Sequence, residues 1–289
     1  MIIEKKSFFI FVNMAYDLSW ASKCPGHLVF LVDLSGSMKK DNKIGQVMDS
    51  LQSVLRQLVT SNLAGKTVVP RFTVSIIGYH TDIVSLFNGG ADDVKNLVQK
   101  AVSTKQPIFD YTEKGIAEPK WQTYMTNAFN AAREDIEKWI AKRGSRLPAP
   151  IVINITDGQP EEDNKSLDIC AVEALQAAQK LKNVRTQDGN VLLYNIHIGN
   201  TNKLKSIEFP TSQPKTTGYE REDKRIKFLF ESSSILPDQV IAIAASKDIP
   251  AHKGSHGMVS NVADKAELVR LIEFVSTTGA IDLESPKPL

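Results

Sequence analysis

The sequence has only two cysteines and no long hydrophobic run. Cys24 and Cys170 are too few for a disulfide framework and too far apart for a Cys-x-x-Cys metal or redox motif, so we expect two reduced thiols. No apolar stretch approaches the roughly 18 residues that a membrane-spanning helix requires. These absences argue against a disulfide-stapled secreted module and against an integral membrane protein.

A dominant charge of either sign is also missing. The chain has 35 Lys and Arg against 33 Asp and Glu, which leaves a formal net charge of +2. Without a global basic field, charge gives no support for binding to nucleic acid or to a membrane surface, and we expect neither partner. Hydrophobic residues at 42% and charged residues at 24% are typical of an ordinary globular chain.

The N-terminus carries only a weak resemblance to a secretory signal. An apolar run at 8–12 follows two lysines, but Asn13 ends the run and Asp17 follows where apolar residues should continue. We therefore expect residues 1–25 to form an N-terminal extension or an edge strand, and the protein to be cytoplasmic.

Strand and helix patterns alternate along the rest of the chain. The segment His27–Asp33 is a continuous apolar run that ends in an acid, typical of a strand buried on both faces, and Ile151–Asp157 repeats it. Between Ile44 and Leu58, apolar residues recur at the spacing of a helix with one buried stripe. The same patterns predict further strands at 71–77, 83–87, 191–198 and 257–260, and further helices at 92–103, 125–139, 166–181, 238–245 and 268–275.

This alternation predicts an α/β fold. We expect a doubly wound, Rossmann-like arrangement with a mostly parallel central sheet, helices on both faces and one antiparallel edge strand at 83–87. No internal repeat, low-complexity tract or long linker divides the chain. We therefore expect one domain with insertions over residues 26–279, followed by a C-terminal tail at 280–289.

Oxygen-bearing side chains follow two of the predicted strands. Asp33, Ser35 and Ser37 lie in the loop after the first strand, and Thr156 and Asp157 come at the end of a later one. Loops that leave the carboxyl ends of parallel strands converge on one edge of the sheet, where ligands bind. Hard oxygen groups from separate loops suit a hard cation of the Mg²⁺ type. The sequence therefore predicts a cation site at this edge.

With these residues in place, the chain resembles the von Willebrand factor type A family, the fold of integrin I domains. The resemblance covers about residues 26–276. It rests on Asp33, Ser35 and Ser37 in Asp-x-Ser-x-Ser spacing, on Asp157 in a later Ile-Thr-Asp-Gly string, and on a threonine between them. The order and placement of these elements make the combined signal strong.

The family places that threonine at the start of a helix. Thr123 fits this context in the string Thr-Tyr-Met-Thr-Asn-Ala-Phe, whereas the alternative, Thr126, lies about one turn into the predicted helix. We therefore take Thr123 as the counterpart.

The resemblance implies a metal-ion-dependent adhesion site. Ser35 and Ser37 would bind the ion directly, Thr123 would bind it directly in one of two arrangements, and Asp33 and Asp157 would act through water. The ion would be Mg²⁺, with Mn²⁺ or Ca²⁺ as alternatives. With few charged groups bound directly, such an ion keeps positive charge and accepts a Glu or Asp from a partner protein.

A long connection at 104–120 precedes the proposed threonine. It carries Asp110, Tyr111 and Glu113, and long loops at the ligand edge of a sheet are commonly functional. We expect these three residues to shape the rim of the partner site. The alternative is a surface loop held in place by its aromatic residues.

The favoured function is a metal-dependent protein-binding module, not an enzyme. The chain resembles stand-alone bacterial proteins of the tellurium-resistance group, which implies a signalling or stress-response role with a kinase or phosphatase as partner. The alternative is a metal-dependent phosphoryl-transfer or hydrolytic enzyme using the same carboxylates, but no histidine has a spacing that marks it as a general acid or base. A third interpretation is an extracellular adhesion domain.

Overall fold

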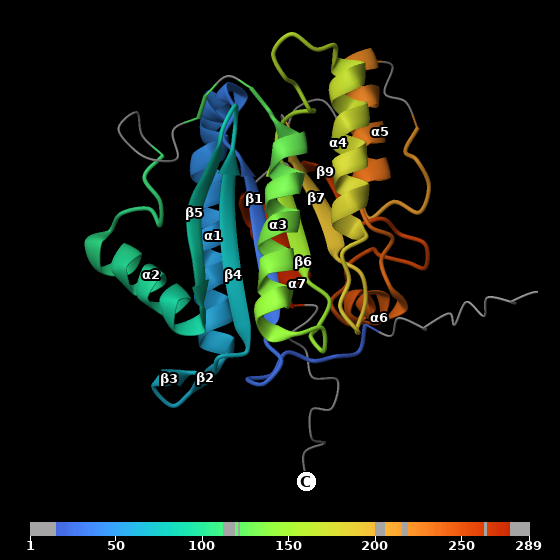
Figure 1. Ribbon diagram of the computed structural model, residues 1–289. Helices are drawn as coiled ribbons and strands as arrows, with labels where there is room; N and C mark the ends of the chain where they lie inside the picture. Colours follow the sequence, from blue (N-terminus) through green and yellow to red (C-terminus); the bar gives the residue numbers. More distant parts are fainter. Residues whose placement is uncertain are drawn as a thin grey trace, which may run out of the picture.

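The computed structural model describes residues 16–111, 119–120, 122–199, 206–215, 219–262 and 265–277. Within these residues, seven strands form one sheet in the order β5-β4-β1-β6-β7-β9-β8 (Figure 1). A separate two-stranded hairpin, β2-β3, lies outside it. The strands are β1 Gly26–Asp33, β2 Leu63–Ala64, β3 Thr67–Val68, β4 Phe72–Tyr79, β5 Ile83–Gly90, β6 Ile151–Thr156, β7 Leu192–Ile198, β8 Ile207–Glu208 and β9 Met258–Val262.

The centre of the sheet is parallel and both of its edges are antiparallel. The five central strands β4, β1, β6, β7 and β9 run parallel to one another, while the edge strand β5 is antiparallel to β4 as expected. A second antiparallel strand, β8, pairs with β9 on the other edge. The sequence pattern did not predict β8, because two residues are too few to show an alternation of apolar and polar side chains.

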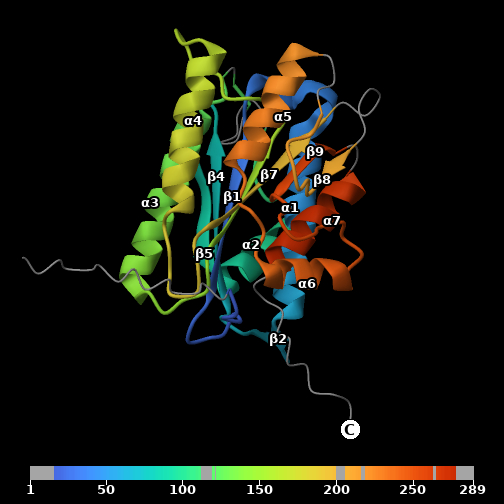
Figure 2. The same cartoon turned by 90° about the vertical axis from the view of Figure 1, so that its right-hand side faces the viewer.

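Helices cover both faces of the sheet, as Figure 2 shows. Side chains of α3, α4 and α5 pack on one face, and those of α1, α2, α6 and α7 on the other. The protein thus has the doubly wound α/β architecture that the sequence predicts. The helices are α1 Lys43–Ser61, α2 Ala91–Thr104, α3 Met125–Arg143, α4 Leu167–Lys182, α5 Glu220–Ser232, α6 Asp238–Ser246 and α7 Lys265–Thr277.

The first strand shows why the sequence folds in this way. Leu28, Phe30 and Val32 belong to the core on one side of the sheet, and Val29 and Leu31 to the core on the other. All five side chains have no exposed surface. Burial on both faces explains the unbroken apolar run, since a strand with one solvated face would alternate with polar residues.

Strands β1 and β6 are neighbours in parallel register and end at the same edge of the sheet. Val32 pairs with Ile155, so Asp33 and Thr156 lie side by side where these strands end. A 3-10 turn, η1 (Gly36–Asn42), then joins β1 to α1. This edge receives the loops that carry the predicted ligands.

The described part of the N-terminal segment runs outside the main sheet. Within residues 16–25 the only bridge joins Ala21 to Cys24, and Trp20 is buried. Both cysteines are free. Among the described residues, no helix is long and apolar enough to cross a bilayer. The expected domain limits stay a prediction, because residues 278–289 lie outside the described part.

Candidate metal centre

The carboxylate of Asp33 organises the loop after β1. Its side chain has no exposed surface, and its Oδ1 accepts a hydrogen bond of 2.8 Å from the backbone N of Ser35. Its Oδ2 accepts a hydrogen bond of 2.6 Å from Oγ1 of Thr156 on the neighbouring strand. A residue that bonds its own backbone two positions on stabilises a tight turn, so this loop conformation is built into the local sequence.

The two serines extend from Asp33 to the second carboxylate. The hydroxyls of Ser35 and Ser37 are 3.0 Å apart, and the Ser37 hydroxyl donates to Oδ1 of Asp157 over 2.6 Å. Ser35 and Asp157 are buried, whereas Ser37 is only partly so. A continuous network of oxygen atoms therefore joins the loops after β1 and β6 and reaches the surface at Ser37.

Thr123 enters the same space from a third loop. Its backbone exchanges two hydrogen bonds of 3.1 Å with Glu161, which fixes the loop before α3 against the loop after β6. A Cβ added to Gly158 would lie 3.6 Å from Oγ1 of Thr123 and 3.9 Å from Oδ2 of Asp33. The threonine hydroxyl and the aspartate carboxylate thus face one small space, which glycine keeps open. Thr126 lies in the first turn of α3, and its buried hydroxyl has no hydrogen-bond partner within the described residues.

Ionising both Asp33 and Asp157 is unfavourable unless a positive charge compensates them. Burial raises the pKa of Asp33 to about 7, and the negative charge of Asp157 acts in the same direction. Hydrogen bonds from Thr156 and Ser35 only partly offset this effect. Two nearby carboxylates and three hydroxyls, of which that of Ser37 belongs to a partly exposed residue, are a donor set that fits a hard divalent cation. Within the described residues, no group of three or more His, Cys, Asp or Glu side chains could hold a metal ion.

Two cations that the sequence patterns did not single out lie near Asp157. Lys43, the first residue of α1, donates from Nζ to Oδ2 of Asp157 over 2.7 Å. Arg225 of α5 is mostly buried, forms an ion pair with Glu222, and interacts electrostatically with Asp157. Burial lowers the pKa of Arg225 to about 10. No spacing rule reveals such partners, because each comes from a helix that only the fold brings to β6.

The structure describes two of the three residues expected at the rim, Asp110 and Tyr111. Asp110 is exposed, and Tyr111 is half-buried and packs against the core on the α1 side of the sheet. Glu113 lies outside the described residues. Ile108 and Phe109, just before them, are buried in the same core. Aromatic anchoring of this connection is therefore seen, while its contribution to a partner site stays a prediction.

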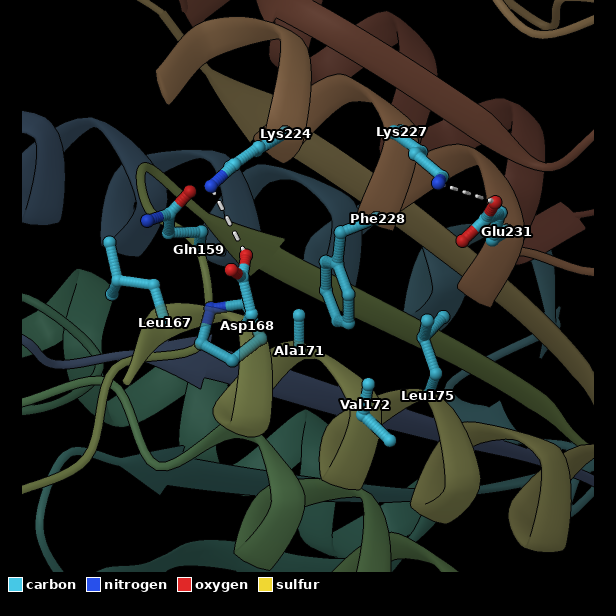
Figure 3. A pocket seen from close by; sticks show the side chains of 11 residues that line it. Gln159, Leu167, Asp168, Ala171, Val172, Leu175, Lys224, Lys227, Phe228 and Glu231 are labelled. Carbon is cyan, nitrogen blue, oxygen red and sulfur yellow. Dashed lines mark ion pairs between the residues drawn. The ribbon is translucent and has the colours of Figure 1, made fainter. Parts of the chain in front are cut away.

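A groove between α4 and α5 flanks the loop after β6 (Figure 3). Gln159 comes from that loop, and apolar side chains such as Phe228 form much of the lining. Two ion pairs cross the view in Figure 3, Lys224 with Asp168 at 3.2 Å and Lys227 with Glu231 at 3.8 Å. None of the five predicted ligands lines this groove, so it is separate from the oxygen cluster.

Solved structures share the fold at low sequence identity. Proximal thread matrix protein 1 of the mussel byssus has a TM-score of 0.52 and 15% identity, covering 89% of this chain and 48% of its own. The pilus adhesin SpaC from Lactobacillus rhamnosus GG has a TM-score of 0.54 and 13% identity, covering 91% of this chain and 31% of its own. The chain thus spans about half of the first and a third of the second. A further structure of the mussel protein, with a zinc-occupied MIDAS motif, gives a TM-score of 0.49 at 14% identity, covering 89% of this chain and 48% of its own.

No protein-family model and no curated protein matches the sequence. The low identity to the solved structures means that they establish a fold and not an activity. That fold agrees with the strand order, the helix layers and the loop after β1 described above. The chain therefore has the fold of a von Willebrand factor type A domain.

Proposed function

We propose that this protein is a divalent-cation-dependent binding domain whose cation accepts an Asp or Glu side chain of a partner protein. One observation carries the proposal. Oxygen side chains from three loops, after β1, after β6 and before α3, meet at one edge of the sheet and reach the surface. Caps and turns alone would not require two serines, a threonine and two carboxylates to share one space.

Five residues of this chain would hold the cation: Asp33, Ser35, Ser37, Thr123 and Asp157. The cation is Mg²⁺ in this proposal, with Mn²⁺ or Ca²⁺ as alternatives. When bound, it supplies a positive charge that attracts an anionic ligand. The chain's own part is to fix the loop through the backbone bond from Ser35 to Asp33, and to orient the Ser37 hydroxyl through its bond to Asp157. Ser37 is the partly exposed member of the site.

We propose a binding role rather than catalysis. Among the described histidines, His197 lies beside β6 opposite Thr156 and is 1% exposed. Burial lowers its pKa well below the usual value. A neutral imidazole shielded from solvent does not supply the general acid that phosphoryl transfer or hydrolysis at these carboxylates would need.

The proposal also includes the cellular location of the protein and the system in which it acts. A cytoplasmic location agrees with the two free cysteines, since disulfides form mainly in oxidising compartments. A role in a bacterial signalling or stress-response system, with a kinase or phosphatase as the acidic partner, rests on the resemblance to stand-alone tellurium-resistance proteins alone.

Calorimetric titration with Mn²⁺ and Mg²⁺ tests the cation site. The wild-type protein binds one divalent ion, and Asp33→Ala and Ser35→Ala weaken the affinity by at least about tenfold while circular dichroism shows an unchanged fold. Ser103→Ala, an exposed serine on α2, is the matched control and keeps wild-type affinity. Unchanged affinity in both site variants would refute the assignment.

The acidic ligand is tested on the Mn²⁺-loaded protein. Acetate, the simplest carboxylate, binds in the presence of Mn²⁺ and is released by a chelator. Acetate binding that persists after chelation would contradict the proposal that the cation receives the partner's side chain.

A further inference from the structure

The buried lysine at the start of α1 is the feature of the site that the proposed function does not use. The side chain of Lys43 is 10% exposed, and that of its partner Asp157 is 1% exposed. The 2.7 Å distance between Nζ and Oδ2 makes this a charge-assisted hydrogen bond in a region of low water access. Lysine is rarely buried without a paired charge, so this contact is a specific one.

Both oxygens of Asp157 are already engaged. Oδ2 accepts from Lys43, and Oδ1 accepts from the hydroxyl of Ser37 over 2.6 Å. A divalent cation that draws on Asp157, directly or through water, must therefore compete with an ammonium group that belongs to the protein. Opening a buried ion pair is costly, because it leaves each charge without its partner.

The same lysine sets the net charge of the loaded site. Asp33 and Asp157 contribute two negative charges when ionised, and Lys43 contributes one positive charge, so the bare cluster has a formal charge of −1. A divalent cation raises it to +1. Without the lysine the loaded cluster would be formally neutral, and its attraction for an incoming carboxylate would be weaker.

We propose that Lys43 is a specificity-determining residue that weakens binding of the cation alone and strengthens binding of a carboxylate to the cation-loaded site. This inference rests on the proposed function. The ammonium group repels an incoming cation and attracts an incoming carboxylate, so it shifts the two affinities in opposite directions.

Calorimetry on two variants and one control tests the inference. Lys43→Met keeps the length of the side chain and removes its charge, and Lys43→Gln keeps a hydrogen-bond donor for Asp157 should the methionine variant fold poorly. Lys40→Met, an exposed lysine in the same loop, is the matched control. Each protein is titrated first with Mn²⁺ and then, loaded with Mn²⁺, with acetate at constant ionic strength.

The two affinities change in opposite directions in the variants. Removing the ammonium tightens Mn²⁺ binding by about tenfold and weakens acetate binding to the loaded protein by about fivefold, since a unit charge within several ångströms acts on both. Lys40→Met shows neither change, because salt screens an exposed charge.

Different results overturn different statements. If the wild-type protein binds Mn²⁺ and both Lys43 variants match Lys40→Met, the inference about Lys43 is wrong and the proposed function stands. If Mn²⁺ affinity rises but acetate affinity does not fall, the specificity role is wrong. If neither the wild-type protein nor any variant binds Mn²⁺, the proposed function and this inference both fall.

Discussion

Asp33 carries a carboxylate without solvent contact at the end of β1, directly after the apolar run Leu28–Val32. Such a group destabilises the folded state when it is ionised, because burial disfavours charge and Asp157 repels it. With a pKa raised to about 7 in the folded protein, the side chain is mostly ionised at pH 8. The metal-free protein therefore loses stability at a residue that the proposed cation site requires, a trade-off common at functional sites.

Replacing this carboxylate with an amide separates stability from binding. Asp33→Asn raises the free energy of unfolding of the metal-free protein at pH 8, on the order of 2 kcal/mol, because a neutral side chain avoids the cost of the buried charge. The folded-state pKa lies above the unfolded one, so the advantage shrinks as the pH falls toward 4. Urea unfolding in chelator measures it. A variant less stable than the wild type at pH 8 would contradict the argument.

At the scale of elements, helix α3 is attached to the sheet by polar contacts as well as apolar ones. Asp135 accepts hydrogen bonds of 3.0 Å from Nε2 of His27 on β1 and from Nδ2 of Asn88 on β5. One turn later, the ring of Trp139 stacks on His27 with centroids 4.9 Å apart. Helix α3 begins two residues after Thr123, so the element attached in this way is also the one that follows the third loop of the candidate site.

Removing this attachment lowers stability. Asp135→Ala reduces the free energy of unfolding by about 1–3 kcal/mol, because the buried His27 and the amide of Asn88 lose an acceptor. Glu134→Ala is the control on the same helix. Its exposed pair with Lys138, at 3.8 Å, is worth less than about 1 kcal/mol. Chemical denaturation compares the two, and equal losses would show that the Asp135 contacts contribute nothing special.

At the scale of the whole molecule, the stability against acid depends on a histidine inside the sheet. His197 of β7 accepts a hydrogen bond of 3.2 Å at Nδ1 from the backbone N of Asn261. Burial lowers its pKa well below the usual value, and the positive charges of Arg225 and Lys43 lower it further. The folded protein therefore keeps this imidazole neutral, while the unfolded chain protonates it below about pH 6.5.

The consequence is a pH dependence of defined sign. Since the unfolded state binds the extra proton, His197 makes the free energy of unfolding fall by up to about 1.4 kcal/mol per pH unit between pH 6.5 and 5. His197→Asn keeps an acceptor for Asn261 and flattens this slope by about 1 kcal/mol per pH unit. His252→Asn, an exposed histidine, leaves the slope unchanged. Chemical denaturation in chelator at several pH values measures this dependence. The same change of unfolding free energy with pH in the wild type and in His197→Asn would refute the prediction.

Local patterns in the sequence were sufficient for most of the architecture. The apolar run before Asp33 and the helical stripe from Ile44 to Leu58 correspond to β1 and α1. Both signals are read within a single element, since the burial of each side chain follows from the period of its own strand or helix. The Asp-x-Ser-x-Ser spacing is equally local, because the backbone bond from Ser35 to Asp33 spans two residues.

Contacts between distant segments could not be predicted from the periodicity of each element alone. Asp157 was expected near Asp33 because the carboxyl ends of parallel strands share an edge. In the structure β1 and β6 are parallel neighbours, and the charge of Asp157 acts on Asp33. For Thr123 the residues alone offered no such rule, and only the resemblance to a family pointed to it.

Only the tertiary structure decided which charges surround the oxygen cluster. The ion pair of Lys43 with Asp157 depends on how the first turn of α1 is rotated against β6, and the approach of Arg225 depends on the placement of α5. Sequence periodicity records which face of an element is buried, but not which neighbour a polar side chain meets at the element's end. That neighbour is set by strand order and helix packing, which form only when the whole chain folds.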